Sequence, residues 1–266
     1  MTRHEFLRRL HELARPRNYL EIGVNTGRSL SLSRVPSIAI DPAFTVTAPL
    51  QLDVELARRT SDEFFARKDP LRHLRSGRNP LRNLRRGRPP FAHYRGGTTL
   101  DLDFIDGMHL IEFVLRDLTN VERFSDWATV IVLDDVLPRN GDEAARERHT
   151  PDWAGDVFKI VPILREHRPD LTLLPVDTTP TGVLVILGAD PANGTLKARY
   201  DEIVEAWVTP DPQHVPPEIL DRRGAISPER LCDAAFWPDL VRARNRRTKR
   251  GKGYDRLRER LRLLSG

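Results

Sequence analysis

Four side chains in the middle of the sequence could act together in proton-transfer or metal chemistry. Asp106 follows one short apolar run, the pair Asp134 and Asp135 follows another, and His109 stands three residues after the first acid. Carboxylate oxygens with open coordination positions suit Mg²⁺ or Mn²⁺ better than zinc, and a bound divalent ion lowers the pKa of a hydroxyl. A histidine with an ordinary pKa of about 6.5 can remove a proton near neutral pH. These residues indicate a site that activates a hydroxyl group.

A glycine turn near the N-terminus indicates a second site. Gly23 and Gly27 follow an apolar run, and without a Cβ their backbone can turn sharply and come close to a ligand. The spacing differs from the G-x-G-x-x-G turn of dinucleotide-binding folds. Glu21 would repel a phosphate and suits a ligand that carries an ammonium and a sulfonium. Asp41 ends the next apolar run, where its carboxylate could accept hydrogen bonds from ribose hydroxyls.

With these motifs, residues 18–188 resemble class I S-adenosylmethionine-dependent methyltransferases. The resemblance implies S-adenosyl-L-methionine as cofactor. It also implies that the acid and glycine turn hold the methionine part, the acid at residue 41 the ribose, and the loop after the third strand the adenine. The cofactor-binding residues carried over are Glu21, Gly23, Asn25, Thr26, Gly27, Ser29, Asp41, Ser61 and Asp62.

Several strings resemble one bacterial subgroup that accompanies sugar and natural-product biosynthesis, and they run from Ser61, Phe104, Val132 and Trp153. The acid and histidine spacing is similar to that of metal-dependent O-methyltransferases that act on catechols and macrolide sugars. The resemblance implies that a hydroxyl on a sugar-containing or other small metabolite is methylated. The implied metal ligands are Asp106, Asp134 and Asp135, with His109 as the general base.

Simpler roles stay open for the same residues. Many metal-free methyltransferases keep an acid where Asp106 stands, and His109 could cap the helix that follows it. The polar stretch 139–151 is long enough to cover the acceptor and is the natural place for acceptor specificity. Just after it, Asp156 and Lys159 could reach the substrate, or they could be an ordinary first-turn acid and a solvated lysine.

Alternating strands and helices predict the frame that positions these residues. Short apolar runs that end in acids or glycines alternate with helical spacing, which requires crossover connections and a mainly parallel sheet. We expect an α/β protein with a Rossmann-like seven-stranded sheet and helices on both faces. The predicted strands lie at 18–23, 37–41, 54–59, 100–105, 129–133, 171–176 and 182–187, and helices at 4–14, 110–121 and 153–167.

Two basic segments are attached to an otherwise acidic chain. Residues 67–95 hold ten Lys and Arg against one acid, and residues 242–262 hold eleven against two, whereas the net charge of the whole chain is +5. The first segment includes a tandem ten-residue repeat at 70–89. We expect a methyltransferase domain at 1–188 with a basic insertion at 67–97, followed at 189–266 by a helical extension with a basic tail.

The basic segments suggest anionic partners. They could bind RNA or an anionic membrane surface through their summed charge. In the tail, Tyr254, Leu257, Leu261 and Leu264 share one helical face, which fits a basic amphipathic helix or a helix docked on the acidic body or on a second copy of the chain. An RNA methyltransferase and a non-catalytic module that retains the cofactor fold are therefore the alternatives.

Composition excludes several classes. Among the 266 residues there is no apolar stretch of the roughly 20 residues that a membrane-spanning helix needs, and residues 1–20 lack a signal-peptide core. A cytoplasmic protein is expected. Cys232 is the only cysteine, so neither an intramolecular disulfide nor a cysteine-based zinc site is available.

Overall fold

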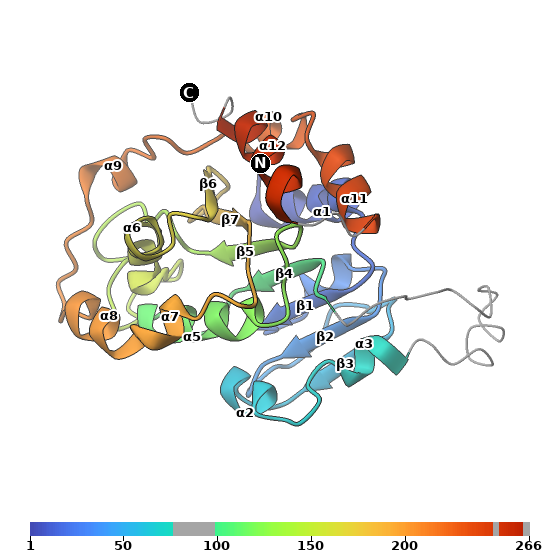
Figure 1. Cartoon of the computed structure of the whole chain (residues 1–266). Helices are drawn as coiled ribbons and strands as arrows, with labels where there is room; N and C mark the ends of the chain where they lie inside the picture. Colours follow the sequence, from blue (N-terminus) through green and yellow to red (C-terminus); the bar gives the residue numbers. More distant parts are fainter. Residues whose placement is uncertain (77–98, 247–249, 263–266) are drawn as a thin grey trace.

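The computed structural model describes residues 1–76, 99–246 and 250–262. Within them the chain forms a seven-stranded sheet in the order β3-β2-β1-β4-β5-β7-β6 (Figure 1). β7 is antiparallel to both of its neighbours, and the remaining neighbours are parallel. The expected Rossmann-like, mainly parallel sheet is confirmed. The strands are β1 (Tyr19–Ile22), β2 (Ser37–Ile40), β3 (Val54–Ala57), β4 (Leu102–Ile105), β5 (Val130–Asp134), β6 (Thr172–Val176) and β7 (Val183–Leu187).

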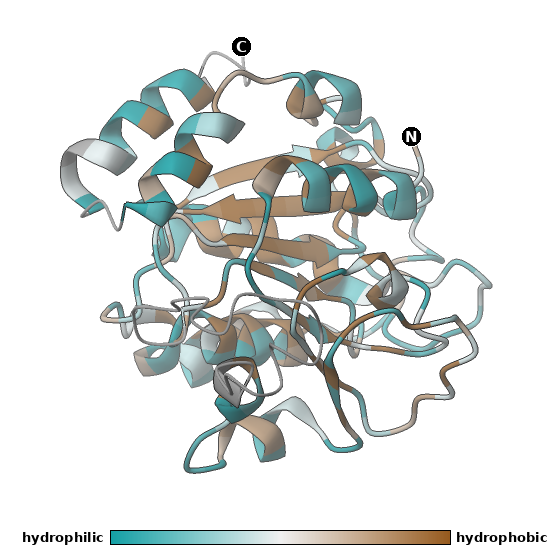
Figure 2. Ribbon diagram, turned by 90° about the vertical axis from the view of Figure 1, so that its right-hand side faces the viewer, coloured by the Kyte–Doolittle hydropathy of each residue, from teal (hydrophilic) through white to brown (hydrophobic). Residues whose placement is uncertain are grey.

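The inner strands are buried along their whole length. Every residue of β1, β2, β4, β5 and β7 is buried, whereas the edge strands β3 and β6 are partly exposed. Helices on both faces remove both sets of side chains from water, so most positions in these strands are apolar and the sequence does not alternate between apolar and polar residues. Figure 2 shows the sheet as a hydrophobic layer between helices with hydrophilic outer sides.

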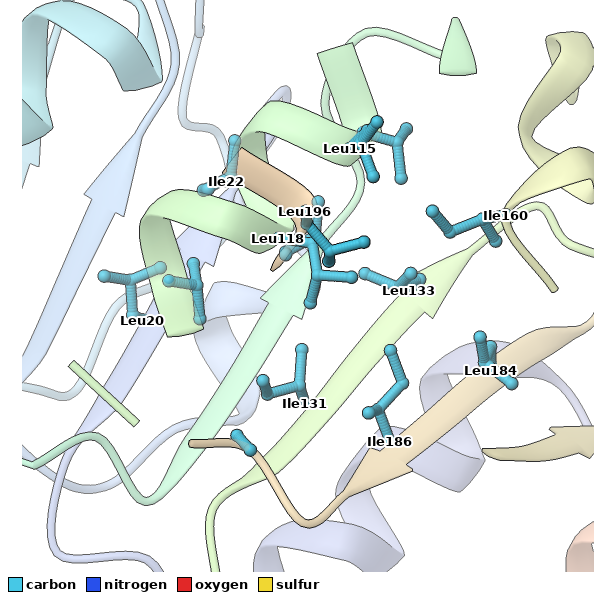
Figure 3. Packing of buried hydrophobic residues seen from close by; sticks show 14 of the residues in the cluster. Leu20, Ile22, Leu115, Leu118, Ile131, Leu133, Ile160, Leu184, Ile186 and Leu196 are labelled. Atoms are coloured by element: carbon cyan, nitrogen blue, oxygen red, sulfur yellow. The ribbon is translucent and has the colours of Figure 1, made fainter. Parts of the chain in front are cut away.

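One face of the sheet packs against helices from the middle of the chain. Figure 3 shows strand residues such as Leu133 and Ile186 packed with the helix residue Leu118 in one buried cluster. The helical elements that contribute to this cluster are α2 (Ser61–Phe65), α3 (Arg72–Ser76), α5 (Ile111–Glu122), η2 (Gly155–Lys159), α6 (Ile160–His167), α7 (Thr195–Ala198) and α8 (Tyr200–Trp207).

The opposite face joins the two ends of the chain. Phe6 and Leu10 of the N-terminal helix pack in the same buried cluster as Trp237 and Leu257 from the C-terminal helices (Figure 1). Residues after 188 therefore share a hydrophobic core with the sheet. The helical elements that contribute to this core are α1 (Arg3–Ala14), η1 (Leu30–Leu32), α10 (Pro228–Cys232), α11 (Trp237–Asn245) and α12 (Arg250–Arg262), while α9 (Pro217–Leu220) lies along the connection.

The apolar face of the basic tail is packed inward. Tyr254, Leu257 and Leu261 of α12 are buried, and the Tyr254 hydroxyl lies 2.8 Å from the carbonyl oxygen of Asp170, to which it donates. A Cβ on Gly188 would lie 1.9 Å from that hydroxyl oxygen, so this close approach requires glycine. The described part of the tail is a helix docked on the body of the same chain.

Parts of the basic segments lie outside the described residues. These are residues 77–98, which hold most of the predicted insertion and of its repeat, together with residues 247–249 and Leu264. None of the helices in the described ranges combines the length and apolar character needed to cross a membrane.

Candidate active site

A cavity of about 570 Å³ opens at the carboxyl ends of four neighbouring strands, β2, β1, β4 and β5. Ligands of open α/β sheets bind at this edge. The structure thus gathers residues that are far apart in the sequence. The predicted site residues on the cavity wall are Gly23, Asn25, Asp41, Ser61, Asp62, Asp106, His109 and Asp135.

Asp41 fastens the glycine turn to the end of β2. Its Oδ2 accepts hydrogen bonds from the backbone N–H groups of Val24 at 2.8 Å and Asn25 at 2.9 Å, while Oδ1 accepts one from Ala43 at 2.7 Å. Gly23 adopts a φ of +88°, and a Cβ there would lie 1.8 Å from the backbone oxygen of Asp106. The turn therefore sits directly against the end of β4, with Asp41 still on the cavity wall.

Glu21 lies behind the turn rather than on the cavity wall. Its carboxylate is fully buried and accepts hydrogen bonds from the Tyr19 hydroxyl at 2.6 Å and the Ser29 hydroxyl at 2.8 Å. Burial raises the pKa of Glu21 to about 8, although both hydroxyls oppose the rise. Thr26 and Gly27 also lie outside the cavity wall. Glu21 therefore supports the turn from behind, while Thr26 and Gly27 belong to the part of the turn that does not face the cavity.

The far end of the cavity contains an acid that the sequence analysis missed. The Ser61 hydroxyl donates to the carboxylate of Asp117 in α5, and burial raises the pKa of Asp117 to about 7. Asp62 accepts a hydrogen bond from the Asn120 side chain at 3.0 Å. Asp117 stands seven residues after Leu110, on the apolar stripe of its helix. An acid within an otherwise apolar helical stripe is the sequence feature that could have identified Asp117 as a buried polar residue.

His109 lies between two carboxylates at the other end of the cavity. Its Nε2 is 3.2 Å from Asp106 Oδ1 and its Nδ1 is 3.1 Å from Asp135 Oδ2. The ring stacks on Trp153 with centroids 4.9 Å apart, and Nδ1 is 2.8 Å from the Trp153 carbonyl oxygen. Burial alone would lower the pKa of His109, but the hydrogen bond that its ring donates to Asp106 and the charge of Asp135 outweigh this effect and raise the pKa to about 9. In this arrangement His109 is an imidazolium at neutral pH.

Asp134 is separated from this cluster. It pairs with the guanidinium of Arg3, whose Nη1 also lies 3.2 Å from Asp106 Oδ2. Asp134 is the last residue of β5, and Asp135 turns away from the strand with a φ of +63°. The two neighbouring carboxylates therefore point to different partners, and Asp135 instead accepts a hydrogen bond from the Thr181 hydroxyl.

Asp156 holds the loop that contributes Arg148 and Pro151 to the cavity wall. Asp156 is fully buried; its Oδ1 accepts from the N–H of Ile111 at 2.8 Å, and its Oδ2 accepts from Arg146 at 2.7 Å and Lys159 at 3.1 Å. These contacts join the loop at 139–151 to the start of α5. Neither Asp156 nor Lys159 lies on the cavity wall, whereas Arg148 and Pro151 of the loop and the adjacent Trp153 do.

The acid and histidine cluster has donors that fit a divalent cation. Asp106, His109 and Asp135 each offer one ligand atom, and these atoms lie within 4.8 Å of one another. Two carboxylates and one imidazole suit Mn²⁺ or Mg²⁺ with positions left open for a hydroxyl. Because a ligating imidazole is neutral, His109 would have to lose the proton that faces the ion.

Comparisons with known proteins place the chain near several solved methyltransferase structures. No protein-family model matches the sequence, and no curated protein matches it. The O-methyltransferase TomG from Streptomyces achromogenes, involved in tomaymycin synthesis and solved with SAM, is 19% identical; the match covers 70% of this chain and 79% of TomG with a TM-score of 0.40.

Two further solved structures give similar values. An O-methyltransferase from Bacillus cereus in complex with SAH is 14% identical over 70% of this chain and 80% of its own, with a TM-score of 0.40. The SAH-bound methyltransferase PaMTH1 from Podospora anserina is 12% identical over 70% of this chain and 78% of its own, with a TM-score of 0.42.

Proposed function

We propose that this protein is an S-adenosylmethionine-dependent methyltransferase that methylates a hydroxyl of a small molecule, such as a sugar-containing metabolite, with the help of Mg²⁺ or Mn²⁺. One observation carries the proposal. A single cavity joins a glycine turn and Asp41 at one end of the sheet edge to the cluster of Asp106, His109 and Asp135 at the other. A nucleoside-type methyl donor and a hydroxyl acceptor can therefore meet within it.

The cofactor half of the cavity would hold the donor through backbone and carboxylate groups. Gly23 lets the main chain approach the ligand, and Oδ1 of Asp41 has a lone pair left to accept a hydrogen bond from a ribose hydroxyl. Ser61 and Asp62 would line the end of the cavity that holds the adenine. Glu21 acts through the turn that it supports, because its side chain is fully buried and does not line the cavity.

At the other end, the acceptor oxygen would attack the methyl carbon in line with the sulfur. A carbon–oxygen bond forms as the sulfur–carbon bond breaks, the electron pair stays on sulfur, and the hydroxyl proton leaves to a base. A bound divalent cation supplies a lower hydroxyl pKa and an oriented oxygen. His109 serves either as a ligand of the cation or as the base. In the second role Asp106 and Asp135 would hold the cation, the Nδ1–H group would donate to the Trp153 carbonyl oxygen, and the free Nε2 would receive the proton.

Cofactor binding tests the first half of the proposal. Asp41→Ala should weaken binding of S-adenosylhomocysteine about tenfold to a hundredfold by calorimetry, because it removes both the ribose acceptor and the anchor of the turn. Asp142→Ala is the matched control, since that carboxylate is 84% exposed and 3.8 Å from His149. Equal affinities of wild type and Asp41→Ala would show that the ribose lies elsewhere, and absence of binding by wild type would refute the proposed function.

Turnover tests the second half. Asp135→Asn should lower divalent-dependent transfer from labelled S-adenosylmethionine to catechol or sugar hydroxyls by about 10²- to 10⁴-fold, while binding of S-adenosylhomocysteine is retained. Full activity of the wild type in excess chelator would exclude the role of the cation. Cofactor binding without transfer to any acceptor would favour the non-catalytic alternative.

The basic segments lead to a second proposal, an anionic partner such as RNA. A groove of about 740 Å³ lies beside α11 and α12, and its lining includes Arg242, Arg246, Arg256 and Arg260, two of which pair with Asp239. Saturable RNA binding that weakens steeply with added salt would support the RNA methyltransferase alternative. No saturable binding would leave the small-molecule acceptor as the remaining candidate.

A further inference from the structure

The start of the N-terminal helix is held at the edge of the cavity. Thr2 caps α1 in a capping box with Glu5. On either side of this cap, the Arg3 N–H donates to the Thr179 carbonyl oxygen at 3.1 Å, and the Thr179 N–H donates to the Met1 carbonyl oxygen at 3.1 Å. Thr179 lies in the connection between β6 and β7. The backbone around Arg3 is therefore fixed against the strand connection, with the Arg3 side chain on the cavity wall.

The guanidinium of Arg3 reaches the carboxylates at the ends of β4 and β5. Nη1 is 3.2 Å from Asp106 Oδ2 and also contacts Asp134, whose side chain is 2% exposed. The Arg3 side chain is 25% exposed, so its charge is only partly screened by water. Asp106 thus divides its two oxygens between Arg3 and His109.

This division places a permanent positive charge beside a candidate ligand of the metal. A guanidinium stays protonated at any ordinary pH and has donors that fit carboxylates. A divalent cation bound by Asp106, His109 and Asp135 would lie close to this charge and would compete with it for the same carboxylate. Electrostatic repulsion at such short range in a partly buried site is substantial.

We propose that Arg3 competes with the divalent cation for Asp106 and so keeps the metal affinity of the cluster low. The inference rests on the metal site in the proposed function. It makes Arg3 a positioning residue: it holds Asp106 and Asp134 when no divalent ion is bound, and its release accompanies metal binding. The N-terminal helix is thereby coupled to the loading of the site.

Direct Mn²⁺ binding tests this inference without any turnover assay. Free Mn²⁺ would be measured by electron paramagnetic resonance during titration of the full-length protein. Arg3→Gln should bind Mn²⁺ at least tenfold more tightly than wild type, equivalent to about 1.4 kcal/mol. Arg3→Met should behave in the same way, because it also removes the charge. Arg8→Gln is the matched control, since Arg8 lies on the same helix but pairs with Glu12 at 2.6 Å on the surface.

The outcomes separate this inference from the proposals on which it depends. Equal Mn²⁺ affinity in wild type and in a folded Arg3→Gln or Arg3→Met variant would overturn the competition while leaving the metal site in place. A tenfold gain in Arg8→Gln as well would show a general charge effect and would also overturn it. Absence of Mn²⁺ binding in every variant would overturn both the competition and the metal site, whereas the cofactor proposal is judged separately by its calorimetry.

Discussion

Asp103→Val is expected to stabilise the folded protein by about 1–3 kcal/mol. Asp103 lies in the middle of β4 with its side chain fully buried, and neither carboxylate oxygen has a hydrogen-bond partner within the described ranges. Burial raises the pKa of this carboxyl well above its ordinary value of 3.8. Valine is close in size, favours strands and brings no polar group that needs a partner.

The neighbouring Asp101 provides the matched contrast. Its carboxylate is equally buried but accepts hydrogen bonds from the Arg17 side chain, both at 2.8 Å, and from the Arg17 backbone N–H at 2.7 Å. The buried Arg244 also has its Nε 3.7 Å from Asp101. Asp101→Val would leave these donors without their acceptor, so it should destabilise the protein by about 3–5 kcal/mol in urea unfolding. If both variants lost stability, the carboxyl at residue 103 would have a partner.

The pH dependence of stability distinguishes Asp103 further. The unfolded carboxyl loses its proton near 3.8, whereas the folded one holds it to higher pH. Over that window the folded state binds more protons, so stability is fully present below about 3.8 and falls as the pH rises toward the folded pKa. The gain from Asp103→Val should therefore be larger at neutral pH than at about pH 5.

The sheet could be predicted because acids or glycines mark the ends of the apolar runs that form its strands. Runs such as residues 38–40 and 130–133 are apolar throughout and are followed directly by an acid, and the helices between them show regular spacing. These features follow from burial on both faces and are local. The antiparallel direction of β7 between β5 and β6 is not local, because it depends on which neighbour a strand meets after folding.

The site could be predicted in outline for the same reason. Carboxyl ends of parallel strands share one edge, which is why Asp41, Asp106 and Asp135 meet. The sequence did not show which of two consecutive acids would face His109, because the answer depends on the turn of the backbone at Asp135. Nor did the sequence show that Arg3 contacts Asp106 and Asp134. That contact depends on how the start of the N-terminal helix is anchored to Thr179.

The crowded carboxylates of the site are paired with positive charges from the same chain. Asp106, Asp134 and Asp135 come together with Arg3 and His109, so the chain itself supplies positive charge to most of its crowded carboxylates. Crowded carboxylates without such partners would repel one another and take up protons. A cation that binds these carboxylates must therefore compete with an existing ion pair rather than occupy a free acidic site.

Gly23→Ala is expected to damage both halves of the cavity at once. The Gly23 N–H donates to the Ile40 carbonyl oxygen at 2.9 Å, and the Asp106 N–H donates to the Ile22 carbonyl oxygen at 2.8 Å, so the turn and the end of β4 are tied to the sheet. A Cβ would lie 1.8 Å from the backbone oxygen of Asp106, at a φ of +88° that alanine rarely adopts. Backbone strain and overpacking together should reduce stability by about 2–5 kcal/mol.

The same substitution should weaken binding of S-adenosylhomocysteine at least tenfold by calorimetry, because relief of the clash moves Gly23 away from Asp106. Gly194→Ala is the control: a Cβ there meets no heavy atom within 4 Å, so its stability should stay within about 0.5 kcal/mol of wild type. Gly27→Ala should fall between the two, since its φ is +78° but its nearest neighbour is a Val46 side-chain carbon at 3.1 Å. If the loss of cofactor affinity did not decrease in the order Gly23→Ala, Gly27→Ala, Gly194→Ala, the turn and the acid cluster would not serve one ligand.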